Sequence, residues 1–192
     1  CREETGKAPN IVSISRFDSI FSKDIGLATS LADMPDLRDF SLGGDDIEVR
    51  IWRAYSLPAQ EGVFLKRSNG KWSGLHIRLK SDQQGDVQAA EVDQLKTPKQ
   101  GWEAFWGKLV DKGILRFPLT PENECDTRRH DGIRYIVEIN QNDTYRNYQY
   151  AAGYDECRES KQMTEIGEII GLEFDSGQEE CNTYEWFPCI TK

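Results

Sequence analysis

No apolar run in this 192-residue sequence approaches the ~18 residues that a membrane-spanning helix needs. Charged residues make up 30% of the chain and hydrophobic residues 38%, which suffices for an apolar core inside a polar surface. The length fits a single domain. We therefore expect a domain that folds in water, so that any contact with a membrane must come through an added anchor.

Basic residues are scarce, since 24 lysines and arginines stand against 33 acidic residues and give a net charge of -9. Non-specific nucleic-acid binding needs a basic surface that displaces counterions from phosphates, so we expect no nucleic-acid partner. Much of the excess lies between Asp155 and Glu185, where ten acidic residues stand against Arg158 and Lys161. This stretch is either a solvated surface or a docking face for a basic protein or a cation.

Histidine and the common catalytic motifs are scarce as well. The sequence has two histidines, and it has no Gly-x-Ser-x-Gly, no His-Glu-x-x-His, no phosphate-binding glycine loop and no dinucleotide fingerprint. It also has no Cys-x-x-Cys pair with histidines at the spacing of a zinc site. We therefore expect no cofactor and no metal, and a non-enzymatic function is favoured.

The segment Arg128-Arg129-His130-Asp131 is the main candidate for catalysis. A small hydrolase could use His130 with Arg128 and Arg129 to position and protonate a leaving group. The same residues also fit a polar turn, because Asp131-Gly132 is common turn chemistry ahead of a strand. The hydrolase is therefore kept as the alternative hypothesis.

The five cysteines divide into Cys1 and four that lie downstream. Cys1 precedes a short polar stretch, so we predict a tether over residues 1–10 and a single domain over residues 11–192. This beginning resembles a mature bacterial lipoprotein, whose first cysteine carries the lipid. The resemblance implies membrane attachment through a lipid on Cys1. The alternatives are an unpaired thiol or a chain that merely starts there.

The four downstream cysteines are predicted to form two disulfides. Residues 132–139 and 144–150 predict a hairpin, because β-branched and aromatic residues flank a turn-forming cluster at 141–143. Antiparallel pairing then brings Cys125 and Cys157 together at the open end of the hairpin, where a bridge would clamp its base. Cys181 and Cys189 are left to close a small loop near the C-terminus. Such bridges would place the chain outside the cytoplasm.

Two further segments predict strands. Residues 47–52 alternate apolar and polar side chains, the period of a strand with one buried face. Asn69-Gly70 lies between alternating runs at residues 63–66 and 71–80, and this dipeptide is a strong signal for a two-residue hairpin turn. The chain is therefore expected to build its sheet from hairpins.

Helical spacing appears in residues 100–112, where a stripe of tryptophan, phenylalanine, leucine and valine ends at Gly113. A second, shorter amphipathic helix is predicted at residues 163–170. The remaining predictions are strands at residues 114–117 and 172–174, and short helices or turns over residues 11–40, where Met34-Pro35 breaks any long helix. The predicted fold is α+β, with an antiparallel sheet built from hairpins, one face covered by a helix, and two disulfides.

The second strand of the Asn69-Gly70 hairpin carries the predicted binding residues. In a two-residue turn Phe64 faces Leu75, and alternation then directs Trp72, His76 and Arg78 to the outer face. Arg50 and Trp52 are expected nearby, and tryptophan and arginine are enriched at binding interfaces. The predicted binding set is Trp72, His76, Arg78, Arg50 and Trp52. A second interpretation stays open, in which Trp52 and Trp72 pack beneath the helix.

Several segments resemble small uncharacterised lipoproteins of Bacteroidetes-type bacteria: residues 48–52, 69–72, 131–139 and 145–148. The resemblance implies location in the bacterial cell envelope, at the outer membrane or cell surface, but it carries no established activity. We expect an exported, lipid-anchored, non-enzymatic binding module. Its ligand is an unidentified protein or glycan, and inhibition of a basic enzyme would fit the charge.

Overall fold

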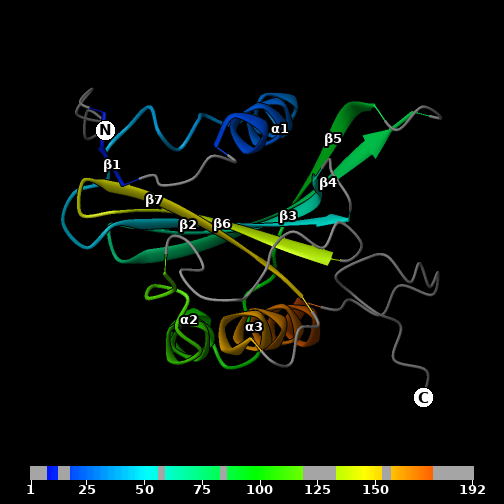
Figure 1. The fold of residues 1–192 in the computed structure, drawn as a ribbon. Helices are drawn as coiled ribbons and strands as arrows, with labels where there is room; N and C mark the ends of the chain where they lie inside the picture. Colours follow the sequence, from blue (N-terminus) through cyan, green and yellow to red (C-terminus); the bar gives the residue numbers. More distant parts are fainter. Residues whose placement is uncertain are drawn as a thin grey trace, which may run out of the picture.

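The computed structural model describes residues 8–12, 18–55, 59–82, 86–118, 133–152 and 157–174. Its centre is a seven-stranded sheet with strand order β1-β7-β6-β2-β3-β4-β5. The strands are β1 (Asn10–Val12), β2 (Ile47–Tyr55), β3 (Ala59–Ser68), β4 (Lys71–Ser81), β5 (Val87–Gln94), β6 (Ile133–Gln141) and β7 (Thr144–Ala151). Figure 1 shows α1 (Asp18–Leu31) on one face of the sheet, and α2 (Trp102–Asp111) and α3 (Arg158–Phe174) on the other.

Both predicted hairpins are confirmed. Asn69 and Gly70 have φ angles of 51° and 74°, the left-handed conformation that a type I′ turn requires at both positions. The turn sets the β3–β4 register, in which Phe64 lies opposite Leu75. The β6–β7 hairpin turns at Asn142 and Asp143, which are also left-handed with φ angles of 53° and 56°. Local turn chemistry thus fixes two of the strand pairings.

The predicted antiparallel sheet covered on one face is wrong in two respects, although the fold is α+β. β1 runs parallel to β7, with Asn10 opposite Thr144, so the sheet is mixed. Helices cover both faces of the sheet (Figure 1). β2 accordingly buries side chains on both sides. On one side Ile51 is fully buried, and on the other side Trp52 is. A strand with two buried faces belongs to a three-layered structure.

The prediction of two disulfides is not supported. Cys125, Cys181 and Cys189 lie outside the described residues, so the described part of the chain places no two sulfurs at bonding distance. Cys157 is buried immediately before α3, and its sulfur accepts a hydrogen bond from the Ser160 amide at 3.5 Å. Such a bond satisfies one of the free N–H groups in the first turn of the helix.

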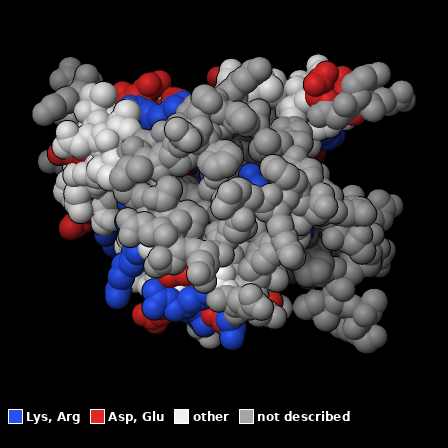
Figure 2. All heavy atoms as spheres, in the orientation of Figure 1, with Lys and Arg blue, Asp and Glu red and all other residues white. Residues whose placement is uncertain are grey.

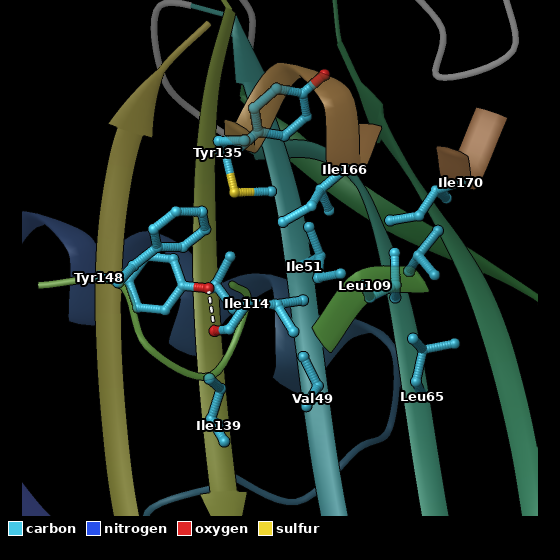
Figure 3. Packing of buried hydrophobic residues seen from close by; sticks show 14 of the residues in the cluster. Val49, Ile51, Leu65, Leu109, Ile114, Tyr135, Ile139, Tyr148, Ile166 and Ile170 are labelled. Carbon is cyan, nitrogen blue, oxygen red and sulfur yellow. Dashed lines mark hydrogen bonds between the residues drawn. The ribbon is translucent and has the colours of Figure 1, made fainter. Parts of the chain in front are cut away.

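α2 and α3 cover an apolar core on one face of the sheet. Val49, Ile51 and Leu65 meet Leu109 of α2 and Ile166 of α3 there, as Figure 3 shows. α2 confirms the helix predicted at residues 100–112. It lies close to β4 because residue 74 is glycine, where a Cβ atom would come within 2.7 Å of the Trp102 ring.

The segment after α2 turns instead of forming the predicted strand at residues 114–117. The Tyr148 hydroxyl donates to the Ile114 carbonyl at 2.6 Å (Figure 3), and Arg146 donates to the carbonyls of Leu115 and Phe117. Side chains of β7 therefore satisfy backbone carbonyls that would be paired with a neighbouring strand if this segment were itself a strand. The strand predicted at residues 172–174 is also wrong, because these residues form the last turn of α3.

α1 is longer than the short helices predicted for residues 11–40, and it ends before Met34-Pro35 as expected. Asp33 adopts the left-handed conformation with φ 53°. Its amide donates to the Ser30 carbonyl at 3.1 Å, and the Met34 amide donates to the Thr29 carbonyl at 3.0 Å. These two bonds form a Schellman motif, which closes the helix and turns the chain back over the sheet.

Candidate functional site

The five predicted binding residues lie on opposite faces of the sheet. The register pairs Arg67 with Trp72 and Ile47 with Arg67, so Trp72 shares the face of the α2/α3 core. His76 and Arg78 follow on that same face by alternation. Arg50 and Trp52 lie one residue out of phase and point toward α1. The structure therefore does not bring these residues together into one site.

Trp72 and its neighbours hold α2 against the sheet. The ring lies 5.2 Å from the Trp106 ring, centroid to centroid, and the indole N–H donates to Glu103 at 2.7 Å. The Arg67 guanidinium lies over the Trp72 ring, 5.5 Å from its centroid. The interpretation of Trp72 as a packing residue beneath the helix thus fits its contacts.

His76 belongs to a buried ionic cluster on the same face. Its Nε2 lies 3.2 Å from Oε2 of Glu61, and Arg53 donates to Oε1 of that carboxylate at 2.9 Å. The His76 residue is only 6% exposed. Both carboxylate oxygens of Glu61 are thus engaged, and the histidine is held inside the molecule instead of facing a ligand in solvent.

Arg50 lies fully buried between the sheet and the chain above it. Its Nε donates to Glu48 at 2.8 Å, and its guanidinium lies 4.8 Å from the Phe64 ring centroid. Lys66 approaches the second Glu48 oxygen at 3.3 Å. A buried charge needs an ion pair and hydrogen bonds. Glu48 supplies the ion pair and one hydrogen bond, whereas Nη1 and Nη2 of Arg50 have no hydrogen-bond partner among the described residues.

Glu138 lies opposite Arg50 on the neighbouring strand β6. It accepts hydrogen bonds from the Trp52 indole and the Tyr145 hydroxyl, each at 2.9 Å. Burial raises the pKa of Glu138, and the charge of Arg50 together with these two donors partly opposes that shift. Burial also raises the pKa of Tyr145. Trp52 is therefore a structural donor inside this network.

A shallow pocket of about 370 Å³ lies where α1 ends. Its lining comes from the last turns of the helix and from the segment Asp33 to Asp36. The hydrogen bonds from Arg38 lower the pKa of Asp36, and this carboxylate is already held by that arginine. Of the two acids in its lining, Asp36 is thus held in an intramolecular pair.

Several predicted site residues lie outside the described residues: Cys1, Arg128, Arg129 and His130. Across the described ranges, no three histidine, cysteine or acidic side chains gather where they could hold a metal ion. None of the helices found there is both long and apolar enough to cross a membrane.

The outer edge of the sheet at β5 is a long open edge among the described strands. β5 pairs with β4 on one side, and none of the described strands pairs with its other side. Val92 is 42% exposed, which is high for an apolar residue in a strand. In Figure 1, β4 and β5 extend away from the body of the sheet.

The β4–β5 hydrogen bonds show which backbone groups of β5 face outward. The Leu95 amide donates to the Gly74 carbonyl at 2.9 Å, so these two residues form a hydrogen-bonded pair. In an antiparallel ladder such pairs alternate. Asp93 and Glu91 therefore direct their backbone groups to β4, and those of Ala90, Val92 and Gln94 face the open edge.

Charged side chains line one face of this edge. Arg78 contacts Asp93 at 2.7 Å, and Lys80 pairs with Glu91 across the β4–β5 ladder. The hydrogen bond from Lys80 lowers the pKa of Glu91. Figure 2 shows acidic atoms over the outer end of β4 and β5, at the upper right of the view. The edge is thus acidic on its outermost strand and basic one strand inward.

The sequence prediction missed β5 because its residues have weak strand propensity. Gln88, Ala89 and Ala90 precede the acidic pair, and none of these types favours strands. A usable signal was the turn-rich stretch Ser81 to Asp86 directly after β4, which predicts a returning strand. Comparisons with protein-family models, with curated proteins and with solved structures find no match to this chain.

Proposed function

We propose that this chain is a non-enzymatic binding module that recognises a protein ligand at the open edge of β5. The observation that carries the proposal is the eight-residue strand Val87–Gln94, whose Ala90, Val92 and Gln94 backbone groups face outward. An extended segment of a partner can add to such an edge as a further strand, because the unpaired N–H and C=O groups supply its hydrogen bonds.

The other end of the sheet supports the choice of this edge. There the outermost strand is β1, which has three residues and so offers few backbone groups. Natural proteins commonly blunt an exposed edge by making it short or by placing lysine or proline on it. β5 is long and has neither lysine nor proline. We infer that it is kept open because a partner occupies it.

The predicted ligand classes were a protein or a glycan, and strand addition favours a protein. Trp72, which would stack on a sugar, contacts Trp106 and Glu103, and His76 is held by Glu61. Lipid attachment at Cys1, envelope location and the alternative hydrolase stay predictions, because Cys1 and His130 lie outside the described residues.

The proposal is tested by selecting linear peptides from a random display library against the folded domain. Selected peptides should bind the wild type and Val92→Thr, which keeps the outward N–H, and should lose binding to Val92→Pro, which removes it. Proline is tolerated on an edge strand where its nitrogen faces solvent, so the fold should persist. Circular dichroism and thermal unfolding check this point.

Hydrogen exchange locates the contact. On peptide binding the amides of Ala90, Val92 and Gln94 should become protected, while those of Glu91 and Asp93 are already bonded to β4. Peptides that bind Val92→Pro as well as the wild type, or that protect amides elsewhere, would overturn the proposal.

A further inference from the structure

Resting on the proposed function, we infer that the ligand strand of β5 carries basic residues at alternate positions, with apolar residues between them. The inference names the chemistry of the partner: an extended segment whose one face is lysine or arginine and whose other face is small or β-branched. It follows from the side chains that line the two faces of the edge.

The first face presents two exposed acids in register. Glu91 and Asp93 are two residues apart, so they point to the same side of β5, roughly 7 Å from each other. Their side chains are 45% and 58% exposed. A strand added at the edge would lie about 4.8 Å away and would place its own side chains directly opposite.

Charge alternates across the strands on this face. β4 contributes Arg78 and Lys80, and β5 contributes Asp93 and Glu91, which pair with them. The two acids are neutralised from one side only among the described strands. Cations on the ligand strand would continue the alternation, because opposite charges on directly opposed residues stabilise a strand pair. The overall charge of -9 would also draw in a basic segment from solution.

The second face presents apolar surface. Val92 is 42% exposed, and Ala90 lies partly buried at the margin of the core under α1. Ligand residues between the basic ones would point to this side. Apolar residues there would bury Val92 and gain the hydrophobic stabilisation that a lone exposed valine lacks. The two faces together define the alternating pattern.

The same charges argue against a second copy of this chain as the occupant. A two-fold antiparallel pair of β5 strands would place the acidic face of one copy beside the acidic face of the other. Like charges on neighbouring strands are destabilising. A basic partner meets no such penalty. Sedimentation of the free domain should show that it does not dimerise through β5.

The test uses synthetic peptides of one composition in two orders. An alternating lysine–valine octamer is compared with a block octamer that has the four lysines together, by fluorescence anisotropy against the full chain. The alternating peptide should bind the wild type more tightly. The double variant Glu91→Gln/Asp93→Asn should bind it roughly tenfold more weakly, since two opposed charge pairs are lost.

A matched control removes two exposed acids from the helices instead, in Asp111→Asn/Glu168→Gln. This variant has the same net charge as the edge variant, so its affinity should fall far less if register matters. If both variants lose the same affinity for the alternating peptide, or if the two peptides bind the wild type equally, the binding is charge attraction without register. Either result would overturn the alternating pattern.

Failure of the inference can be separated from failure of the proposed function. If uncharged peptides bind at the edge and lose binding to Val92→Pro, strand addition stands and the basic pattern falls. If the alternating peptide binds Val92→Pro as tightly as the wild type, both fall. Self-association that depends on residue 92 would name a second copy as the occupant and would also overturn the inference.

Discussion

Neighbouring residues of β2 are buried by different chemistry on opposite faces of the sheet. Under α2 and α3, β2 contributes Val49 and Ile51, which belong to the apolar and aromatic core on that face. Under α1 the next residues along the same strand are Arg50 and Trp52, which are equally buried but belong to an ionic and hydrogen-bonded network. Val49 and Ile51 thus pack in an apolar core, while Arg50 and Trp52 add polar contacts to the apolar cluster under α1.

The polar contacts of β2 are more specific than its apolar contacts. Apolar side chains tolerate exchange when volume is conserved, because dispersion and burial are not directional. The α1 face instead demands particular partners, since Glu138 needs both the Trp52 and Tyr145 donors. Asn140 makes equally specific contacts with the segment above the sheet. Its side-chain amide donates to the Leu37 and Phe40 carbonyls at 2.9 and 2.6 Å. Register on this face is fixed by polar geometry.

The largest effect is expected from Arg50→Met. The change removes the buried cation beside Glu48 and opposite Glu138, so buried carboxylates lose their compensation. Breaking a buried ion pair from one side costs about 3 to 5 kcal/mol of unfolding free energy. Urea denaturation measures it. Arg50→Lys keeps the charge and should lose clearly less; equal losses would show that charge is not what matters on this face.

The corresponding destabilising substitution in the α2/α3 core is Leu109→Ala. Leu109 of α2 is fully buried against the sheet core, so truncation leaves a cavity. The expected loss is about 3 kcal/mol by the same denaturation measurement. Leu109→Met conserves volume and should cost under about 1.5 kcal/mol. If the methionine variant were as unstable as the alanine variant, the α2/α3 core would depend on exact side-chain shape and not only on buried volume.

Two tyrosines of β7 each donate one buried hydrogen bond, and they do so on opposite faces of the sheet. Tyr145→Phe leaves an oxygen of the Glu138 carboxyl without its donor, and Tyr148→Phe leaves the Ile114 carbonyl without one. Bonds to charged groups contribute more, so about 2 kcal/mol is expected for the first and about 1 kcal/mol for the second. Thermal unfolding of both variants gives the order, and a reversed order would contradict the account of the two faces.

Sequence patterns predicted the elements with strong local signals and missed those fixed by distant contacts. Asn69-Gly70 sets its hairpin because both residues accept a left-handed backbone, and the apolar stripe of α2 is visible at its own spacing. The separation of Trp52 from Trp72 depends also on the β2–β3 register, which the Asn69-Gly70 turn does not set. β1 beside β7 joins residues far apart in the chain, and β5 has only two typical strand residues, Val87 and Val92.

The candidate site was missed for the same reason. Tryptophan, histidine and arginine indicated a binding surface, but burial against α2 and pairing with Glu61 engage Trp72 and His76 inside the molecule. Six of the eight residues of β5 are glutamine, alanine or acidic, a composition that resembles that of a loop, and only Val87 and Val92 are typical of a strand. An open edge is a property of sheet order, so it becomes visible only when the position of β5 is known.

The smallest predicted effect is a pH dependence that arises from Glu138 on the α1 face. Burial raises the pKa of Glu138 in the folded chain above its ordinary value of 4.5. A carboxyl with a raised folded pKa stabilises the fold below its unfolded pKa and loses that contribution as the pH rises through the folded pKa. Glu138→Gln cannot ionise. The unfolding free energy of the wild type minus that of the variant should therefore fall as the pH increases from about 4 to 8. Urea denaturation across this range measures the difference; a difference that is flat or increases with pH would show that Arg50, Trp52 and Tyr145 outweigh burial and hold Glu138 ionised.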